Sequence, residues 1–77
     1  MFPLQNLRSG ESGCIVDVDG QRDLVQRLSE LGLRTGVTVK LLRSGSPLLI
    51  ALDGHRMTLR PDDRVTILVE PLVSLPQ

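Results

Sequence analysis

The sequence contains one cysteine and one histidine, Cys14 and His55, which are its only thiol and imidazole side chains. A structural zinc site needs four ligands, usually arranged as closely spaced pairs. A Cys-His nucleophilic pair also needs a third group that orients the base. The sequence places no such partners near either residue. We therefore expect no metal centre, no cofactor and no catalytic residue, which means a protein that is not an enzyme.

Three carboxylates, Asp17, Asp19 and Asp23, could attract a hard cation through their oxygen atoms. Each also has a structural explanation, because Asp19 can cap a helix and Asp23 lies one turn before Arg27, in the favourable order for an ion pair. The glycine-rich segment 10–13 lacks the lysine and hydroxyl residue of a phosphate-binding loop. We interpret these residues as turns and helix ends.

Composition excludes several kinds of binding site. Phe2 is the only aromatic residue, whereas grooves for proline-rich peptides and for single-stranded nucleic acid are built from aromatic rings. Nine basic and nine acidic residues cancel, so no net field attracts phosphates or anionic lipid. We expect the basic residues to be solvated or to face a protein partner, with no nucleic acid bound.

The cellular location is inferred from segments that are missing. No apolar run approaches the roughly 20 residues of a membrane-spanning helix. Residues 1–4 lack the basic start and long apolar stretch of a secretory signal. A single cysteine forms no intramolecular disulfide. These features predict a cytoplasmic protein without direct membrane insertion.

Glycine and proline divide the chain into short elements within one domain, residues 1–77, with a core over about 4–70 and an irregular tail at 71–77. Residues 21–31 predict the only helix, because Leu24, Leu28 and Leu31 form an apolar stripe that Val25 widens. Gly32 follows as its C-terminal cap. Five segments have the composition of strands: 14–18, 37–41, 48–52, 55–60 and 64–69. The fold class is therefore all-β and small, a strongly bent antiparallel barrel with one inserted helix.

Two turns predict the register of the central strands. A two-residue turn at Asp53-Gly54 pairs Leu52 with His55, and a four-residue turn at 44–47 pairs Leu42 with Leu49. Because side chains alternate between the faces of a strand, one set forms the core: Val39, Leu41, Leu48, Ile50, Leu52, Met57 and Leu59. In the first strand, Ile15 and Asp17 should share one face and Cys14, Val16 and Val18 the other.

With these elements placed, the sequence resembles the FeoA family of bacterial ferrous iron transport. Its most specific stretch is Arg27-Leu28, Leu31-Gly32-Leu33 and Gly36, followed by Val39, an RL-x-x-LGL-x-x-G pattern that joins the helix to the next strand. Gly10 with Gly13-Cys14-Ile15 is similar to the family's opening strand. Leu59-Arg60 with Ile67 and Val69 is similar to its closing strands. The resemblance implies an SH3-like barrel. It also implies a role in supporting the membrane permease FeoB, which carries a cytosolic GTPase domain.

The least expected feature is an apolar cluster on the outer face of the barrel. The register places Leu42, Leu49 and Ala51 on the face opposite to the core, with Arg56 at its edge. An apolar centre with a charged rim is typical of protein interfaces. We predict that Leu42, Leu49, Ala51 and Arg56 bind a partner.

The resemblance makes the cytosolic region of a FeoB-type permease that partner, with self-association into a homo-oligomer through the same cluster as a second outcome. Three alternatives stay open. The helix covers the cluster, the C-terminal tail covers it, or the barrel is a metal-responsive regulatory or nucleic-acid-associated module.

Overall fold

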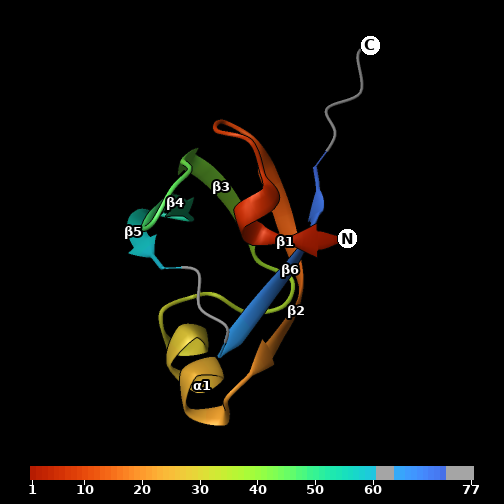
Figure 1. Cartoon of the computed structure of the whole chain (residues 1–77), viewed down its shortest axis with the longest axis vertical. Helices are drawn as coiled ribbons and strands as arrows, with labels where there is room; N and C mark the ends of the chain where they lie inside the picture. Colours follow the sequence, from red (N-terminus) through yellow and green to blue (C-terminus); the bar gives the residue numbers. More distant parts are fainter. Residues whose placement is uncertain (61–63, 73–77) are drawn as a thin grey trace.

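The computed structural model describes residues 1–60 and 64–72. Within these residues six strands form one antiparallel sheet in the order β1-β6-β2-β3-β4-β5 (Figure 1). The strands are β1 (Phe2–Pro3), β2 (Ser12–Gly20), β3 (Thr38–Arg43), β4 (Leu48–Leu52), β5 (His55–Leu59) and β6 (Val65–Pro71). One α-helix, α1 (Arg22–Glu30), and one short 3-10 helix, η1 (Leu4–Asn6), complete the chain. The predicted small antiparallel fold with one inserted helix is confirmed.

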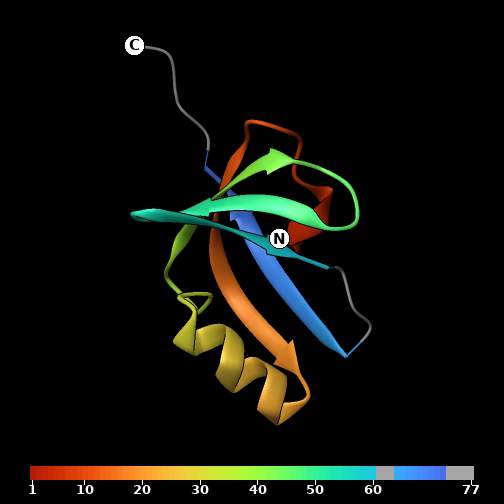
Figure 2. The same ribbon diagram turned by 90° about the vertical axis from the view of Figure 1, so that its left-hand side faces the viewer.

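The sheet bends so strongly that its two halves face each other. Figure 2 shows β3, β4 and β5 crossing β2 and β6 at a steep angle. The helix α1 follows β2 and lies below β3, β4 and β5 in the views of Figures 1 and 2. Its C-terminal cap at Gly32 adjoins Leu52, which faces the core. The outer face of β3–β5 is therefore clear of α1, and the predicted alternative in which the helix covers it is wrong.

The space between the two halves is filled by aliphatic side chains. The buried core contains Leu4, Leu7, Ile15, Leu28, Leu33, Val39, Leu41, Leu48, Ile50, Leu52, Ile67 and Val69. Five of the seven residues predicted for the core are in this set, and Met57 and Leu59 pack against it while partly buried. No polar or charged side chain is buried in the described part of the chain. Apolar burial is therefore the main favourable term in this fold.

The helix α1 ends in a hydrogen-bonded cap that determines where the following chain runs. Gly32 has a φ of +104°, and its N–H donates to the Ser29 carbonyl at 3.0 Å. The Leu33 N–H donates to the Leu28 carbonyl at 2.8 Å, which completes a Schellman motif. This turn buries Leu33 completely and leaves Leu31 47% exposed. The cap predicted at Gly32 is confirmed, whereas the predicted place of Leu31 on the buried stripe is wrong.

A β-bulge in β2 changes which side chains face the core. Ile15 pairs with Val69 and Asp17 with Leu68, so Val16 is an extra residue relative to β6. An inserted residue shifts the alternation of faces. Ile15 is buried and Val18 also packs against the core, although simple alternation predicted opposite faces for these two residues.

A second bulge separates β3 from β4. The ladder pairs Lys40 with Ala51 and Leu41 with Ile50, and then Arg43 rather than Leu42 with Leu49. The predicted Leu42–Leu49 pair is therefore wrong, because Leu42 is the inserted residue. The hairpin between β4 and β5 has the predicted register throughout, from Leu52 opposite His55 to Leu48 opposite Leu59.

Both ends of the chain are more ordered than the sequence predicted. Phe2 and Pro3 form β1 and pair with Val69 and Leu68 of β6, a strand that the sequence analysis missed. At the other end, β6 continues through Glu70 and Pro71, which pair with Cys14 and Gly13. The prediction that an irregular tail begins at residue 71 is wrong. The predicted turn at 61–63 and the rest of the tail, 73–77, lie outside the described residues.

Candidate protein-docking surface

The outer face of β3, β4 and β5 brings together three of the four residues predicted to bind a partner. Ala51 stands between Lys40 on β3 and Arg56 on β5. Leu49 is the next outward residue of β4 and stands opposite Thr58. We call the outward side chains of these strands the docking face, which consists of Lys40, Leu49, Ala51, Arg56, Thr58 and the adjoining Leu42.

Burial separates the centre of the docking face from its rim. Leu49 and Ala51 are partly buried and alternate along β4 with the buried Leu48, Ile50 and Leu52. This alternation proves that they point away from the core. Leu42 is also partly buried, but the bulge places it beyond the paired rows instead of opposite Leu49. The predicted apolar cluster therefore exists with Leu42 at its edge.

The rim of the docking face is basic. Lys40, Arg56 and Thr58 are exposed on neighbouring strands, and Arg60 follows directly after β5. Within residues 1–60 and 64–72, no carboxylate forms an ion pair with Lys40, Arg56 or Arg60. A chain with zero net charge thus gathers basic side chains on one face, which favours an acidic partner.

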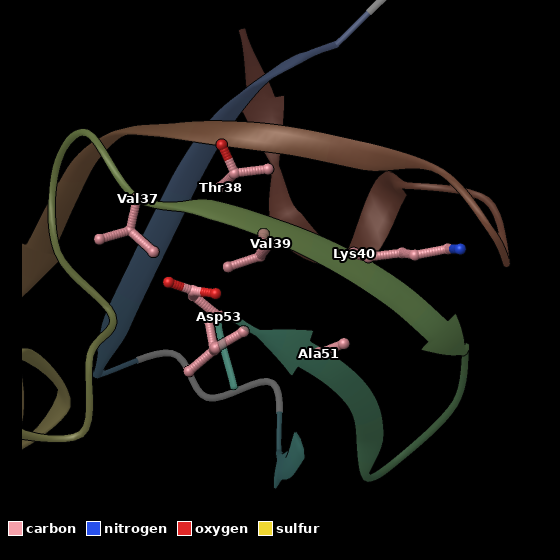
Figure 3. A pocket seen from close by; sticks show the side chains of 7 residues that line it. Val37, Thr38, Val39, Lys40, Ala51 and Asp53 are labelled. Carbon is pink, nitrogen blue, oxygen red and sulfur yellow. The ribbon is translucent and has the colours of Figure 1, made fainter. Parts of the chain in front are cut away.

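A pocket of about 550 Å³ opens at one end of this face. It forms where β3 and β4 separate, since their ladder stops at Lys40 and Ala51. Figure 3 shows Val37 and Val39 on one side of this opening and Ala51 on the other, with the carboxylate of Asp53 between the strands. The lining combines apolar residues with Thr38, Lys40 and Asp53, and the pocket has room for a side chain of a partner. The pocket was not predicted from the sequence. Its only sequence signal is that Val37 lies just before β3 and Asp53 just after β4.

The residues considered for metal chemistry are not assembled into a site. Cys14 is on β2, partly buried, with its Sγ 3.8 Å from the Ile15 carbonyl oxygen. His55 begins β5, which β3 and β4 separate from β2 in the sheet. No group of three or more histidine, cysteine or acidic side chains gathers anywhere in the described ranges. The expectation that neither Cys14 nor His55 belongs to a metal or catalytic site stays a prediction.

No helix among the described residues is long and apolar enough to cross a membrane.

Known proteins share both the sequence pattern and the fold. The FeoA domain family matches residues 2–71. A solution structure of FeoA from Chlorobium tepidum is 28% identical, with a TM-score of 0.84 over 94% of this chain and 71% of that one. A crystal structure of Stenotrophomonas maltophilia FeoA complexed with zinc is 25% identical, with a TM-score of 0.78 over 91% of both chains. That protein is described as an SH3 domain protein and proposed as a bacterial ferrous iron transport activating factor.

A third solved structure, of an iron uptake regulatory protein (FeoA), is 28% identical, with a TM-score of 0.75 over 88% of this chain and 96% of that chain. Among curated proteins none matches. The family match covers nearly the whole chain, and the strand order, the single helix and the strongly bent sheet agree with an SH3-like barrel. The chain belongs to the FeoA family.

Proposed function

We propose that this protein is a non-enzymatic, cytoplasmic accessory factor of bacterial ferrous iron uptake, and that it binds the cytosolic region of a FeoB-type permease. Membership of the FeoA family supports a role in ferrous iron uptake. A relative described as a possible ferrous iron transport activating factor supports it as well. The protein acts by occupying a surface of the permease and holding it in one conformation, because a ligand shifts an equilibrium only through different affinities for two states.

The observation that carries the proposal is the docking face itself. Leu49 and Ala51 form an apolar centre, and Lys40 and Arg56 form a basic rim. Apolar centres with polar rims are the usual arrangement at protein interfaces. The adjoining pocket adds a recess for one side chain of the partner.

The direct test is Leu49→Asp, which places a negative charge at the centre of the face. We expect binding to the purified cytosolic region of the permease, measured by calorimetry, to weaken at least about tenfold. Thermal stability should change little, because Leu49 points away from the core. Val25→Asp is the matched control, since Val25 is also partly buried but lies on α1, and this variant should bind like the wild type.

The remaining outcomes each have a clear meaning. A Leu49→Asp variant that unfolds would place Leu49 in the core, and one that binds the permease normally would show that the docking face has no part in binding. Sedimentation of the protein alone tests self-association. A dimer that Leu49→Asp dissociates, together with unchanged permease binding, would assign the face to a second copy of the chain.

One observation favours the alternative of a regulatory module. A relative is described as an iron uptake regulatory protein, and the rim of the docking face is basic. In that case a DNA duplex should bind with the strong salt dependence of phosphate contacts and should compete with the permease fragment. Binding of the permease fragment that excess duplex leaves unchanged would reject this alternative.

A further inference from the structure

Among the described residues, the outermost strand of the barrel, β5, has a free edge. It is the last strand in the sheet order and pairs only with β4. At the other end of the order, β1 contains two residues, whereas β5 contains five. A sheet edge of this length presents a row of backbone donors and acceptors that a further strand can pair with.

Hydrogen bonds across the sheet determine which residues of β5 present those groups. The Leu41 N–H donates to the Glu11 carbonyl at 2.9 Å, and the Leu41 carbonyl accepts from the Gly10 N–H at 2.6 Å. Backbone groups alternate in direction along a strand, so those of Lys40 point to its partner Ala51. The backbone N–H and carbonyl of Ala51 therefore point back to β3 and not to β5. Arg56 stands opposite Ala51 on β5, so its own N–H and carbonyl point away from β4.

Thr58 follows Arg56 at the strand repeat of two residues, so its N–H and carbonyl also point outward. No backbone bond from Arg56 or Thr58 to another segment is present among the described residues. The free edge therefore offers two donors and two acceptors in line. Their side chains belong to the docking face, which makes the edge and the face one continuous surface.

The side chains beside this edge specify the chemistry of the strand that fits. Arg56, Thr58 and Arg60 point to the outer side, and neither guanidinium has an ion-pair partner within the described ranges. Met57 and Leu59 point inward and are only partly buried. The side chains of an added strand would alternate between the outer and the inner side. On the outer side, acidic residues four positions apart would lie beside Arg56 and Arg60. On the inner side, apolar residues would lie beside Met57 and Leu59.

A second copy of this chain fits the edge poorly. The antiparallel pairing of two β5 strands that uses the whole strand, His55–Leu59, is centred on Met57. It puts Arg56 of each copy opposite Thr58 of the other and diagonally next to Arg56 and Arg60 of the other. Diagonal neighbours on paired strands are within reach of long side chains, so these like charges repel each other. Charged residues on an edge are a common protection against such self-pairing. The same charges attract an acidic strand.

We infer that β5 receives an extended segment of the partner by strand addition, and that this segment alternates apolar residues with acidic residues placed beside Arg56 and Arg60. The inference rests on the proposed function and specifies how the docking face captures its partner. Backbone hydrogen bonds to Arg56 and Thr58 hold the segment, and the two arginines select its sequence.

A designed peptide tests the inference without the permease. The probe is acetyl-Val-Glu-Val-Ser-Val-Glu-Val-amide, titrated into the full-length protein and followed by amide NMR. At saturation, hydrogen exchange at the Arg56 and Thr58 amides should slow at least about tenfold, because each donor becomes hydrogen-bonded. The same peptide with lysine for both glutamates should bind at least about tenfold more weakly. A peptide methylated on the backbone nitrogens of its glutamates and serine keeps every charge but loses the donors that face β5, so it should not bind.

Two variants of Thr58 complete the test. Thr58→Pro removes only the outward N–H, which an edge strand tolerates, and should weaken peptide binding at least about tenfold. Thr58→Ala keeps that N–H and should bind like the wild type. If Thr58→Pro fails to fold, the methylated peptide on the wild-type protein decides the question. Equal binding of the methylated and unmethylated peptides would overturn strand addition, and equal binding of the lysine peptide would overturn acidic selection.

The inference and the proposed function fail in different ways. Permease binding that Leu49→Asp abolishes and Thr58→Pro leaves unchanged would reject strand addition while the docking face stands. Peptide binding with protected Arg56 and Thr58 amides, without any binding of the permease fragment, would keep the strand-receiving edge and reject the permease as the partner. Slowed exchange at these amides that depends on protein concentration alone would assign the edge to a second copy and overturn the inference.

Discussion

At the scale of single residues, Gly20 shows how closely this small barrel is packed where β2 ends. Its φ is +151°, and a Cβ on its backbone would overlap the Arg64 carbonyl oxygen and lie 2.6 Å from the Val65 Cα. The neighbouring Gln21 N–H donates to the same Arg64 carbonyl at 2.8 Å. Because all these atoms belong to the backbone, they cannot move aside for a side chain. Gly20 therefore allows β2 and β6 to meet at this end.

The first prediction is that Gly20→Ala destabilises the protein by at least about 2 kcal/mol, from backbone strain and steric overlap together. Gly36→Ala is the control, because Gly36 also has a positive φ, +95°, but open space around its Cβ position. It should lose only about 1 kcal/mol, the conformational part of the cost. Urea denaturation of the two variants measures the difference, and equal losses would show that no overlap exists.

The bulge at Leu42 determines which side chains lie at the centre of the docking face. Without it, Leu42 would stand opposite Leu49 and the apolar centre would be a compact cluster of three side chains. With it, Arg43 takes that position and the centre narrows to Leu49 and Ala51. The bulge therefore brings a basic residue next to the apolar centre, which strengthens the preference for an acidic partner.

At the scale of elements, α1 is held to the barrel by one buried leucine and by its C-terminal cap. Leu28 is 7% exposed, and its carbonyl accepts the Leu33 N–H that closes the cap. Leu33 is fully buried. The helix α1 is too short to be stable alone. The contacts of Leu28 and Leu33 therefore hold it against the barrel.

The second prediction compares two leucines of this helix. Leu28→Ala should cost about 2–5 kcal/mol, because it removes a buried side chain and leaves a cavity. Leu31→Ala should cost less than about 1 kcal/mol, since the 47% exposed Leu31 has little contact to lose. Thermal or urea unfolding distinguishes the two positions. A loss below about 1 kcal/mol for Leu28→Ala would mean that the helix does not pack on the barrel.

At the scale of the whole molecule, the N-terminal segment places one buried side chain between the two halves of the sheet. The sheet order leaves β5 unpaired with β6. The short helix η1 packs against β6, and its Leu4 lines a small hollow together with Leu48, Leu59 and Ile67. Leu4 is 1% exposed. The side chain thus joins the two halves of the sheet where no backbone ladder does.

The third prediction is that Leu4→Ala lowers the free energy of unfolding by about 2–5 kcal/mol, as expected for a fully buried leucine. Gln5→Ala, in the same turn but with an exposed side chain, should change it by less than about 0.5 kcal/mol. Chemical denaturation measures both. If Leu4→Ala were as stable as Gln5→Ala, the N-terminal segment would not contribute to the core of the barrel.

Much of the fold could be predicted from local patterns. The alternation of Leu48, Ile50 and Leu52 determines the core face of β4, since side chains on a strand alternate strictly. The Asp53-Gly54 turn sets the register of the β4–β5 hairpin because only two residues connect the strands. The same two features place Leu49, Ala51 and Arg56 on the outer face, so most of the candidate site follows from them.

Other features were decided only by the tertiary structure. The bulges at Val16 and Leu42, the pairing of β1 with β6 and the pocket between β3 and β4 all depend on segments far apart in the chain. A bulge has no local signal here, because it arises where a bent sheet must change its twist to close. The free edge of β5 is likewise a property of the complete strand order. The sequence by itself determined which faces of the strands are apolar. The closure of the barrel decided which strands pair and which edge stays free, because strand pairing depends on contacts from the whole chain.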